Sequence, residues 1–296
     1  MKSLVNRTKS LLILGAMTIT GTICLNSTPT LAGTLHGDWN YSIDSSNDSM
    51  AGNHVGGTKY EIFSMAMKQT ADEIIMAINT NFGIDGASSQ YANDGHVSWG
   101  DMLLNFTDLS LDAASNAAQL FGIRFAANNE SGVPELGVYE NVIGKTIARE
   151  NGLLLQDASL RGYNNWVSSR GGHPQIGELS ANDPYFSQDH HIQNVIASGN
   201  KIGDVNLLSD LSNLGLDFGH FGATGTQTIA FSFARDLLPD GSFIAHLAPE
   251  CDNDVIAMRG LLETPPEPVP EPSAALALGA FGLLFSAKKM RRRHTS

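Results

Sequence analysis

Alternating apolar and polar positions are the strongest pattern in this chain, and they predict β-strands. Between residues 227 and 233, Ile229, Phe231 and Phe233 alternate with smaller or polar residues, as the two faces of a half-buried strand require. Similar apolar patterns predict further strands at 60–68, 74–78, 102–106, 121–125 and 243–247, of which 74–78 is apolar on both faces.

Turn-forming residues separate these predicted strands. Clusters of Gly, Asn, Asp and Pro occur at 83–86, 93–95, 128–132, 171–174 and 238–241, where such residues favour tight turns. Short strands joined by turns of this kind predict an all-β fold, an antiparallel β-sandwich, in a single domain.

Helical patterning is weak by comparison. Leu207, Leu208, Leu211 and Leu214 have the three- and four-residue spacing that predicts one short amphipathic helix over 205–214. The segment 153–189 is rich in Gly, Asn and Ser, and we expect it to form long loops around one or two strands.

The N-terminus has the pattern of a secretory signal peptide. Three basic residues within the first nine positions precede an apolar stretch from Leu11 to Leu25, which is followed by Thr30-Leu31-Ala32. This order predicts export through the Sec translocon and removal of residues 1–32 by signal peptidase after Ala32.

The C-terminus has the pattern of a short membrane anchor. A Pro-rich linker at 263–272 leads into an apolar run at 273–287, and the basic tail 288–296 contains five Lys or Arg residues. A helix of about 15 residues spans only roughly 22 Å of a hydrocarbon core that is about 30 Å thick. The positive-inside rule places the tail in the cytoplasm and the domain at 33–262 outside it.

The motif Pro270-Glu271-Pro272, followed by an apolar run and a basic end, resembles the PEP-CTERM sorting signal of bacterial proteins that exosortases process. The fragments 60–62, 72–79 and 99–106 are similar to exosortase-dependent surface proteins found mainly in cyanobacteria. More distantly they resemble jelly-roll, DOMON and carbohydrate-binding sandwiches. The resemblance implies a transient inner-membrane anchor, cleavage by an exosortase, and a final place at the cell surface or in an exopolysaccharide matrix. It supplies no catalytic residues.

Charge and cysteine content restrict the function further. The chain has 18 Lys and Arg and 30 Asp and Glu. With three basic residues in the signal and five in the tail, the part between them carries 10 − 30 = −20, which argues against binding nucleic acid. Only Cys251 remains after signal removal, so no internal disulfide can form, and we expect a semi-buried thiol near a strand end.

Acidic and aromatic residues provide the candidate sites. Five aspartates are calcium candidates, because Ca²⁺ prefers carboxylate and carbonyl oxygens: Asp44, Asp48, Asp101, Asp252 and Asp254. The spacing of the nine His residues matches no zinc motif, and we expect them in polar surface or loop positions.

Tyr163 and Trp166 lie among polar residues and are candidates for glycan contact, whereas Trp39 and Trp99 have strand-like surroundings that predict burial. We therefore expect a non-catalytic structural or adhesive surface protein. A carbohydrate-binding module is one alternative. A secreted glycan or ester hydrolase is another, because paired carboxylates are not visible in a sequence.

Overall fold

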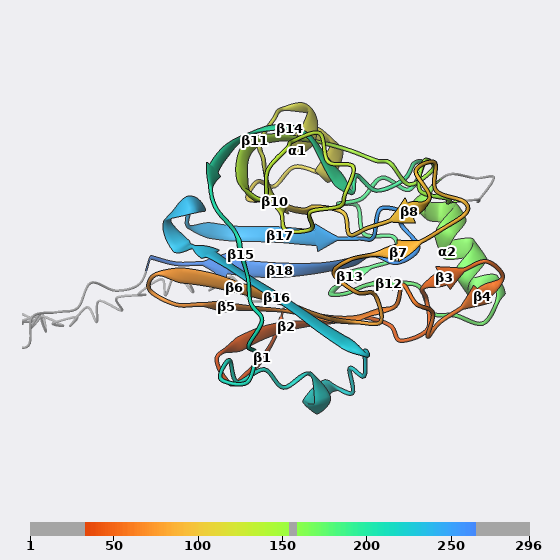
Figure 1. Ribbon diagram of the computed structural model, residues 1–296, viewed down its shortest axis with the longest axis horizontal. Helices are drawn as coiled ribbons and strands as arrows, with labels where there is room; N and C mark the ends of the chain where they lie inside the picture. Colours follow the sequence, from red (N-terminus) through yellow and green to blue (C-terminus); the bar gives the residue numbers. More distant parts are fainter. Residues whose placement is uncertain (1–32, 154–158, 265–296) are drawn as a thin grey trace, which may run out of the picture. The chain divides into compact units, whose positions relative to one another are not determined.

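Two antiparallel six-stranded sheets contain most of the strands in a computed structural model that describes residues 33–153 and 159–264 (Figure 1). The first sheet has the spatial order β1-β2-β5-β6-β16-β15. Its strands are β1 (Thr34–His36), β2 (Trp39–Ile43), β5 (Ile62–Gln69), β6 (Glu73–Thr80), β16 (Gln227–Ala234) and β15 (Asn206–Leu207).

The second sheet has the order β14-β11-β10-β9-β17-β18. Its strands are β14 (Val195–Gly203), β11 (Gly137–Lys145), β10 (Leu120–Arg124), β9 (Met102–Asn105), β17 (Gly241–Leu247) and β18 (Ile256–Leu262). The all-β prediction is confirmed, and each of the six predicted strands corresponds to a strand of one of the two sheets.

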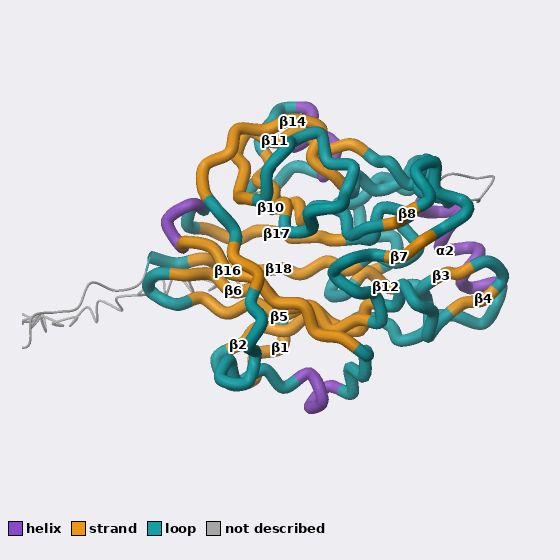
Figure 2. Tube along the Cα trace, in the orientation of Figure 1, coloured by secondary structure: helices purple, strands orange, loops and turns teal. Residues whose placement is uncertain are grey.

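Short strands and helices lie at the ends and edges of these sheets, as Figure 2 shows. Three two-stranded hairpins pair β3 (Met50–Ala51) with β4 (His54–Val55), β7 (Ala87–Ser88) with β8 (His96–Val97), and β12 (Gln175–Ile176) with β13 (Leu179–Ser180). The helices are α1 (Leu111–Asn116), α2 (Leu160–Ser169) and the 3-10 turns η1 (Phe218–Phe221) and η2 (Arg235–Leu237).

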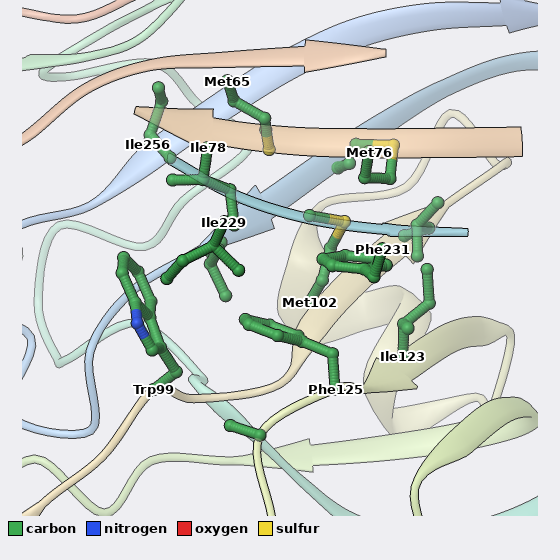
Figure 3. Close-up of a cluster of buried hydrophobic side chains, with 14 of the residues drawn as sticks. Met65, Met76, Ile78, Trp99, Met102, Ile123, Phe125, Ile229, Phe231 and Ile256 are labelled. Atoms are coloured by element: carbon green, nitrogen blue, oxygen red, sulfur yellow. The ribbon is translucent and has the colours of Figure 1, made fainter. Parts of the chain in front are cut away.

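The main hydrophobic core lies between the two sheets (Figure 3). Met65, Ile78 and Phe231 come from the first sheet, and they pack with residues of the second sheet such as Ile123. The ring of Phe231 stacks on Phe125 with 4.7 Å between centroids. The alternation that marks these strands in the sequence is therefore the alternation between this core and the outer layers.

Both outer faces of the sandwich are also covered. A second apolar cluster joins the outer face of the second sheet to α1 and α2. A third cluster covers the first sheet around Trp39 and Tyr41, and it includes Ile75 and Ala77. This cover explains why the strand at 74–78 is apolar on both faces. Trp39 and Trp99 are buried, as predicted.

The predicted helix at 205–214 is wrong. The segment contains β15 and then an irregular loop, in which Leu208, Leu211 and Leu214 pack on the third cluster. The Asp210 carboxylate accepts hydrogen bonds from the backbone N–H and the hydroxyl of Ser212 at 3.0 and 2.7 Å. Local side-chain bonds of this kind compete with a helix, so the leucine spacing reflects contact with a sheet.

The expectation that 153–189 contains only loops and strands is also wrong in part. The strands β12 and β13 are present, but α2 occupies Leu160–Ser169. The side chain of Ser159 caps this helix by accepting a hydrogen bond from Gly162 N. Leu160, Tyr163 and Val167 form its buried face, and the Gly and Asn residues between them obscured this spacing in the sequence.

The predicted signal peptide at 1–32, the motif Pro270-Glu271-Pro272, the apolar run at 273–287 and the basic tail lie outside the described residues. Within the described ranges, no helix combines the length and the apolar character that crossing a membrane requires.

Candidate functional site

Four buried carboxylates come together where one end of the first sheet meets β18. Asp44 and Asp48 lie in the loop between β2 and β3, Glu61 immediately precedes β5, and Asp254 lies two residues before β18. All four residues are buried, with at most 7% of the surface exposed in any of them. We call this group the carboxylate centre.

Backbone amides hold one oxygen of each aspartate in the centre. Asp44 Oδ1 accepts from Gly177 N at 2.9 Å, and Asp48 Oδ2 accepts from Gln175 N at 2.8 Å. Asp254 Oδ2 accepts from Ile62 N at 2.7 Å. These bonds join the loop after β2 to the β12–β13 hairpin, and β18 to the start of β5.

The carboxylate of Glu61 is held in a similar way, through Oε2. This atom accepts from the Ser49 hydroxyl at 2.6 Å and from Gly57 N. The remaining oxygens of three side chains, Asp44 Oδ2, Asp48 Oδ1 and Glu61 Oε1, are buried and have no hydrogen-bond donor among the described residues. Buried polar atoms usually have partners, so three such atoms in one group require an explanation.

No described Lys or Arg forms an ion pair with this group. Burial, together with the neighbouring carboxylates, raises the pKa of Asp44 and Asp254 well above the ordinary range. Burial also raises the pKa of Asp48 to about 8. The centre therefore resists ionisation in the absence of a cation.

The structure brings together only part of the predicted calcium set. Oxygen atoms of Asp44, Asp48 and Asp254 lie within 4.8 Å of one another. Asp101 is elsewhere, where its carboxylate accepts from Asn129, Ser131 and Ile196 N at 2.7 Å each. Asp252 accepts from Asn194 Nδ2 at 2.9 Å. The prediction of Asp101 as a ligand is therefore wrong for this centre, and the sequence did not indicate Glu61.

A groove of about 1010 Å³ lies next to the carboxylate centre. It is lined by the β3–β4 hairpin, the loop after β7, residues 151–153 and one face of α2, which lie together at one end of Figure 1. Met50, Tyr60 and Asn253 line it, and each is one or two residues from a member of the centre. The two sites therefore share chain segments.

Amide, hydroxyl and aromatic groups dominate the groove. Tyr91 is 57% exposed, and Trp166 lies half-buried on α2; both residues line the groove. The guanidinium of Arg170 stacks on the Trp166 ring, 3.1 Å from its centroid. The described residues that line the groove include Lys59 but no Asp or Glu.

The two predicted glycan contacts have different positions. Trp166 lines the groove, so its assignment as a contact stays a prediction. Tyr163 faces inward from α2, and its hydroxyl donates to Asp48 O at 2.8 Å. Because Tyr163 is only 4% exposed, it cannot stack on a ligand and instead joins α2 to the carboxylate centre. The sequence did not single out Tyr91, which lies in a turn-rich segment.

The histidines are only partly where we expected them. His246 is fully buried and bonds to Gln193 O at 2.8 Å, and His191 is also buried, so neither occupies a polar surface. His36, Asp217 and His220 form an exposed or half-exposed group, with the two imidazoles stacked 3.9 Å apart.

Cys251 is fully buried, and burial raises its thiol pKa, which disfavours the reactive thiolate.

Glu250 provides a pH prediction, because burial raises its pKa from 4.5 to about 7. The folded protein then holds a proton that the unfolded chain releases, so the stability due to Glu250 is present below about pH 4.5 and is lost by pH 7. We expect Glu250→Gln to reduce the loss of unfolding free energy between pH 4.5 and 7.5 by about 3 kcal/mol. Urea denaturation at both pH values measures this change.

His246, whose pKa is lowered to about 4 by burial, changes stability in the opposite direction and is common to both proteins. Equal pH dependence in the two proteins would contradict the prediction.

Comparison of the chain with known protein families, curated proteins and solved structures found no match.

Proposed function

We propose that this chain is an exported surface protein whose β-sandwich binds glycan in the extracellular matrix and has an adhesive, non-catalytic role. The groove beside α2 is the observation that supports this proposal most directly. Its volume of about 1010 Å³ lies at the upper end of the range for small-molecule sites, about 300–1,000 Å³. An extended oligosaccharide segment matches this size.

The composition of the groove fits a sugar ligand. Sugars present hydroxyl groups, which pair with amides and hydroxyls, and apolar ring faces, which stack on aromatic side chains. The lining supplies amides from Asn53, Gln90 and Asn165 and aromatic surface from Tyr91 and Trp166. Strongly anionic ligands are disfavoured by the acidic chain as a whole, so we propose a neutral or weakly charged glycan.

The fold supports the same proposal at a coarser level. We propose that the sandwich belongs with jelly-roll, DOMON or carbohydrate-binding modules, which also use two antiparallel sheets. The hydrolase alternative receives less support from the groove. Most glycoside hydrolases place two carboxylates across the bond that they cleave, and the described lining residues include no acid.

The Tyr91→Ala variant tests glycan binding. We expect it to reduce affinity at least tenfold for the ligand that the unmodified protein selects on an array of matrix oligosaccharides, because tenfold corresponds to about 1.4 kcal/mol. Isothermal titration with the selected glycan gives the value. Trp166→Ala should also abolish binding, but Trp166 is half-buried and packs on the second apolar cluster, so its melting temperature has to be compared as well.

Leu207→Ala is the matched control, because Leu207 is 48% exposed on β15 and does not line the groove. It should bind glycan normally. A protein that neither binds nor cleaves any matrix glycan would exclude the groove as a glycan site and favour a purely structural role.

We also propose that the C-terminal segment sorts the protein. In this proposal Sec exports the chain, the segment 273–287 holds it briefly in the inner membrane, and an exosortase cuts near Pro270-Glu271-Pro272. The support is the order of motif, apolar run and basic tail in the sequence. A sandwich whose sheets both end before this segment is consistent with cleavage that leaves the fold intact.

A further inference from the structure

We propose that the carboxylate centre of Asp44, Asp48, Glu61 and Asp254 is a calcium site that fixes the floor of the groove. This inference does not depend on glycan binding. It rests on the geometry of the four side chains and on the oxygens among them that no described donor satisfies.

The geometry allows one ion to contact three carboxylate side chains at once. Two ligands on opposite sides of Ca²⁺, each about 2.4 Å away, lie about 4.8 Å apart. The oxygens of Asp44, Asp48 and Asp254 all lie within 4.8 Å of one another. One oxygen of each residue is already oriented by a backbone N–H, so the carboxylates are held in position before an ion arrives.

The unsatisfied oxygens provide a second, independent argument for a ligand. Asp44 Oδ2, Asp48 Oδ1 and Glu61 Oε1 are buried and accept no hydrogen bond from the described residues. Asp48 and Glu61 have no exposed surface at all. Leaving such atoms unpaired is costly in a protein interior, whereas a cation held between Asp44, Asp48 and Asp254 would give the buried carboxylates a positive partner.

The type of donor selects the ion. The centre offers carboxylate oxygens and contains no His or Cys among its members, which favours a hard cation over zinc or copper. Ca²⁺ accepts many oxygen ligands in irregular geometry, whereas Mg²⁺ requires a near-ideal octahedron and retains several waters. A buried centre with carboxylates from three separate segments therefore suits Ca²⁺.

An ion at this position would join several walls of the groove. Asp48 is two residues from Met50, Glu61 follows Tyr60, and Asp254 follows Asn253, and all three neighbours line the groove. The hydroxyl of Tyr163 attaches α2 to the same point through Asp48 O. Calcium would thus act in the role that disulfides play in many exported domains, since this chain has only one described cysteine.

The test uses the purified full chain, freed of metal with EGTA and then titrated with CaCl₂. We expect saturable heat of binding and a rise in melting temperature of about 5 °C in 10 mM Ca²⁺, as a millimolar or tighter site would give. Asp48→Asn should abolish both effects. Because the amide oxygen of Asn can still accept from Gln175 N, its melting temperature in EGTA should be close to that of the unmodified protein, and a merely structural role for Asp48 would not remove the calcium effect alone.

Asp44→Asn is the second variant if Asp48→Asn does not fold, and the same loss of the calcium effect is expected. The matched control is Asp217→Asn, which alters the exposed group His36, Asp217 and His220 and should leave the calcium effect unchanged. Absence of binding heat and identical melting curves in Ca²⁺ and EGTA would overturn the proposal. A full calcium effect in Asp48→Asn would also overturn it, and an equal effect of Mg²⁺ would overturn the choice of ion.

Discussion

Replacing Asp101 by alanine is expected to lower the free energy of unfolding by about 3–5 kcal/mol, because each buried donor that loses its acceptor costs about 1–3 kcal/mol. Three donors would lose their acceptor: the amide of Asn129, the hydroxyl of Ser131 and the backbone N–H of Ile196. Arg124 would lose support as well, because its Nε donates to Asn129 Oδ1 at 2.9 Å. Urea denaturation followed by tryptophan fluorescence measures the loss.

Two comparisons give this prediction its specificity. Asp189→Ala should cost less than about 0.5 kcal/mol, since Asp189 is exposed and forms only a surface ion pair with Arg161. The rise in melting temperature on adding Ca²⁺ should persist in Asp101→Ala, because Asp101 is not part of the carboxylate centre. A loss below 1 kcal/mol, or the disappearance of the calcium effect, would contradict the role assigned to Asp101.

The strands were predictable because their pattern is local. In β16 and β9, successive side chains alternate between the central core and the outer layers. The sequence therefore shows a large apolar residue at every second position. The error at 205–214 has the opposite cause. Leu208, Leu211 and Leu214 pack on the outside of a sheet, so their spacing results from contacts with distant residues and only imitates a helix.

The sequence predicted that acidic residues form the candidate site, but it did not predict correctly which of them come together. Asp44 and Asp48 are close in sequence. Asp254 lies near them because β18 of the second sheet packs against β2 and β5 of the first sheet. No local pattern encodes that contact. Asp101 has the same residue type and is also buried, but both of its oxygens accept hydrogen bonds, from Asn129, Ser131 and Ile196 N. Neighbours that are distant in sequence therefore decide which buried acids keep an oxygen without a hydrogen-bond donor among the described residues.

The groove was less predictable still. Its walls come from the β3–β4 hairpin, the loop after β7, residues 151–153, α2 and Asn253, which the sequence presents as separate turns and loops. Trp166 was recognisable as an aromatic among polar residues, but the same reasoning selected Tyr163, which α2 turns inward. The two residues point in different directions because they lie at different positions around α2. The sequence could not show this, since we expected a loop at this segment.

Glu271→Ala is expected to block processing completely. In an envelope preparation, the variant should remain in the inner membrane with the mass of its full C-terminus, whereas the unmodified protein should lose the residues that follow the motif. The physical reason is position. The apolar run begins directly after Pro272, so in the proposed sorting Glu271 would lie at the membrane boundary, where a membrane-embedded enzyme could reach it. Repeated prolines in general favour an extended backbone that a protease can reach.

The chain contains its own matched control for this experiment. Pro266-Glu267-Pro268 repeats the tripeptide four residues earlier, and an extended chain with about 3.1 Å per residue would put Glu267 roughly 12 Å farther from the proposed anchor. Glu267→Ala should therefore be processed normally if position selects the cleavage site. Normal release of Glu271→Ala would remove the exosortase proposal. Equal retention of both variants would show instead that the enzyme needs the acidic linker as a whole. Neither substitution alters the described sandwich, so melting temperature and calcium binding should stay unchanged, which separates a sorting defect from a folding defect.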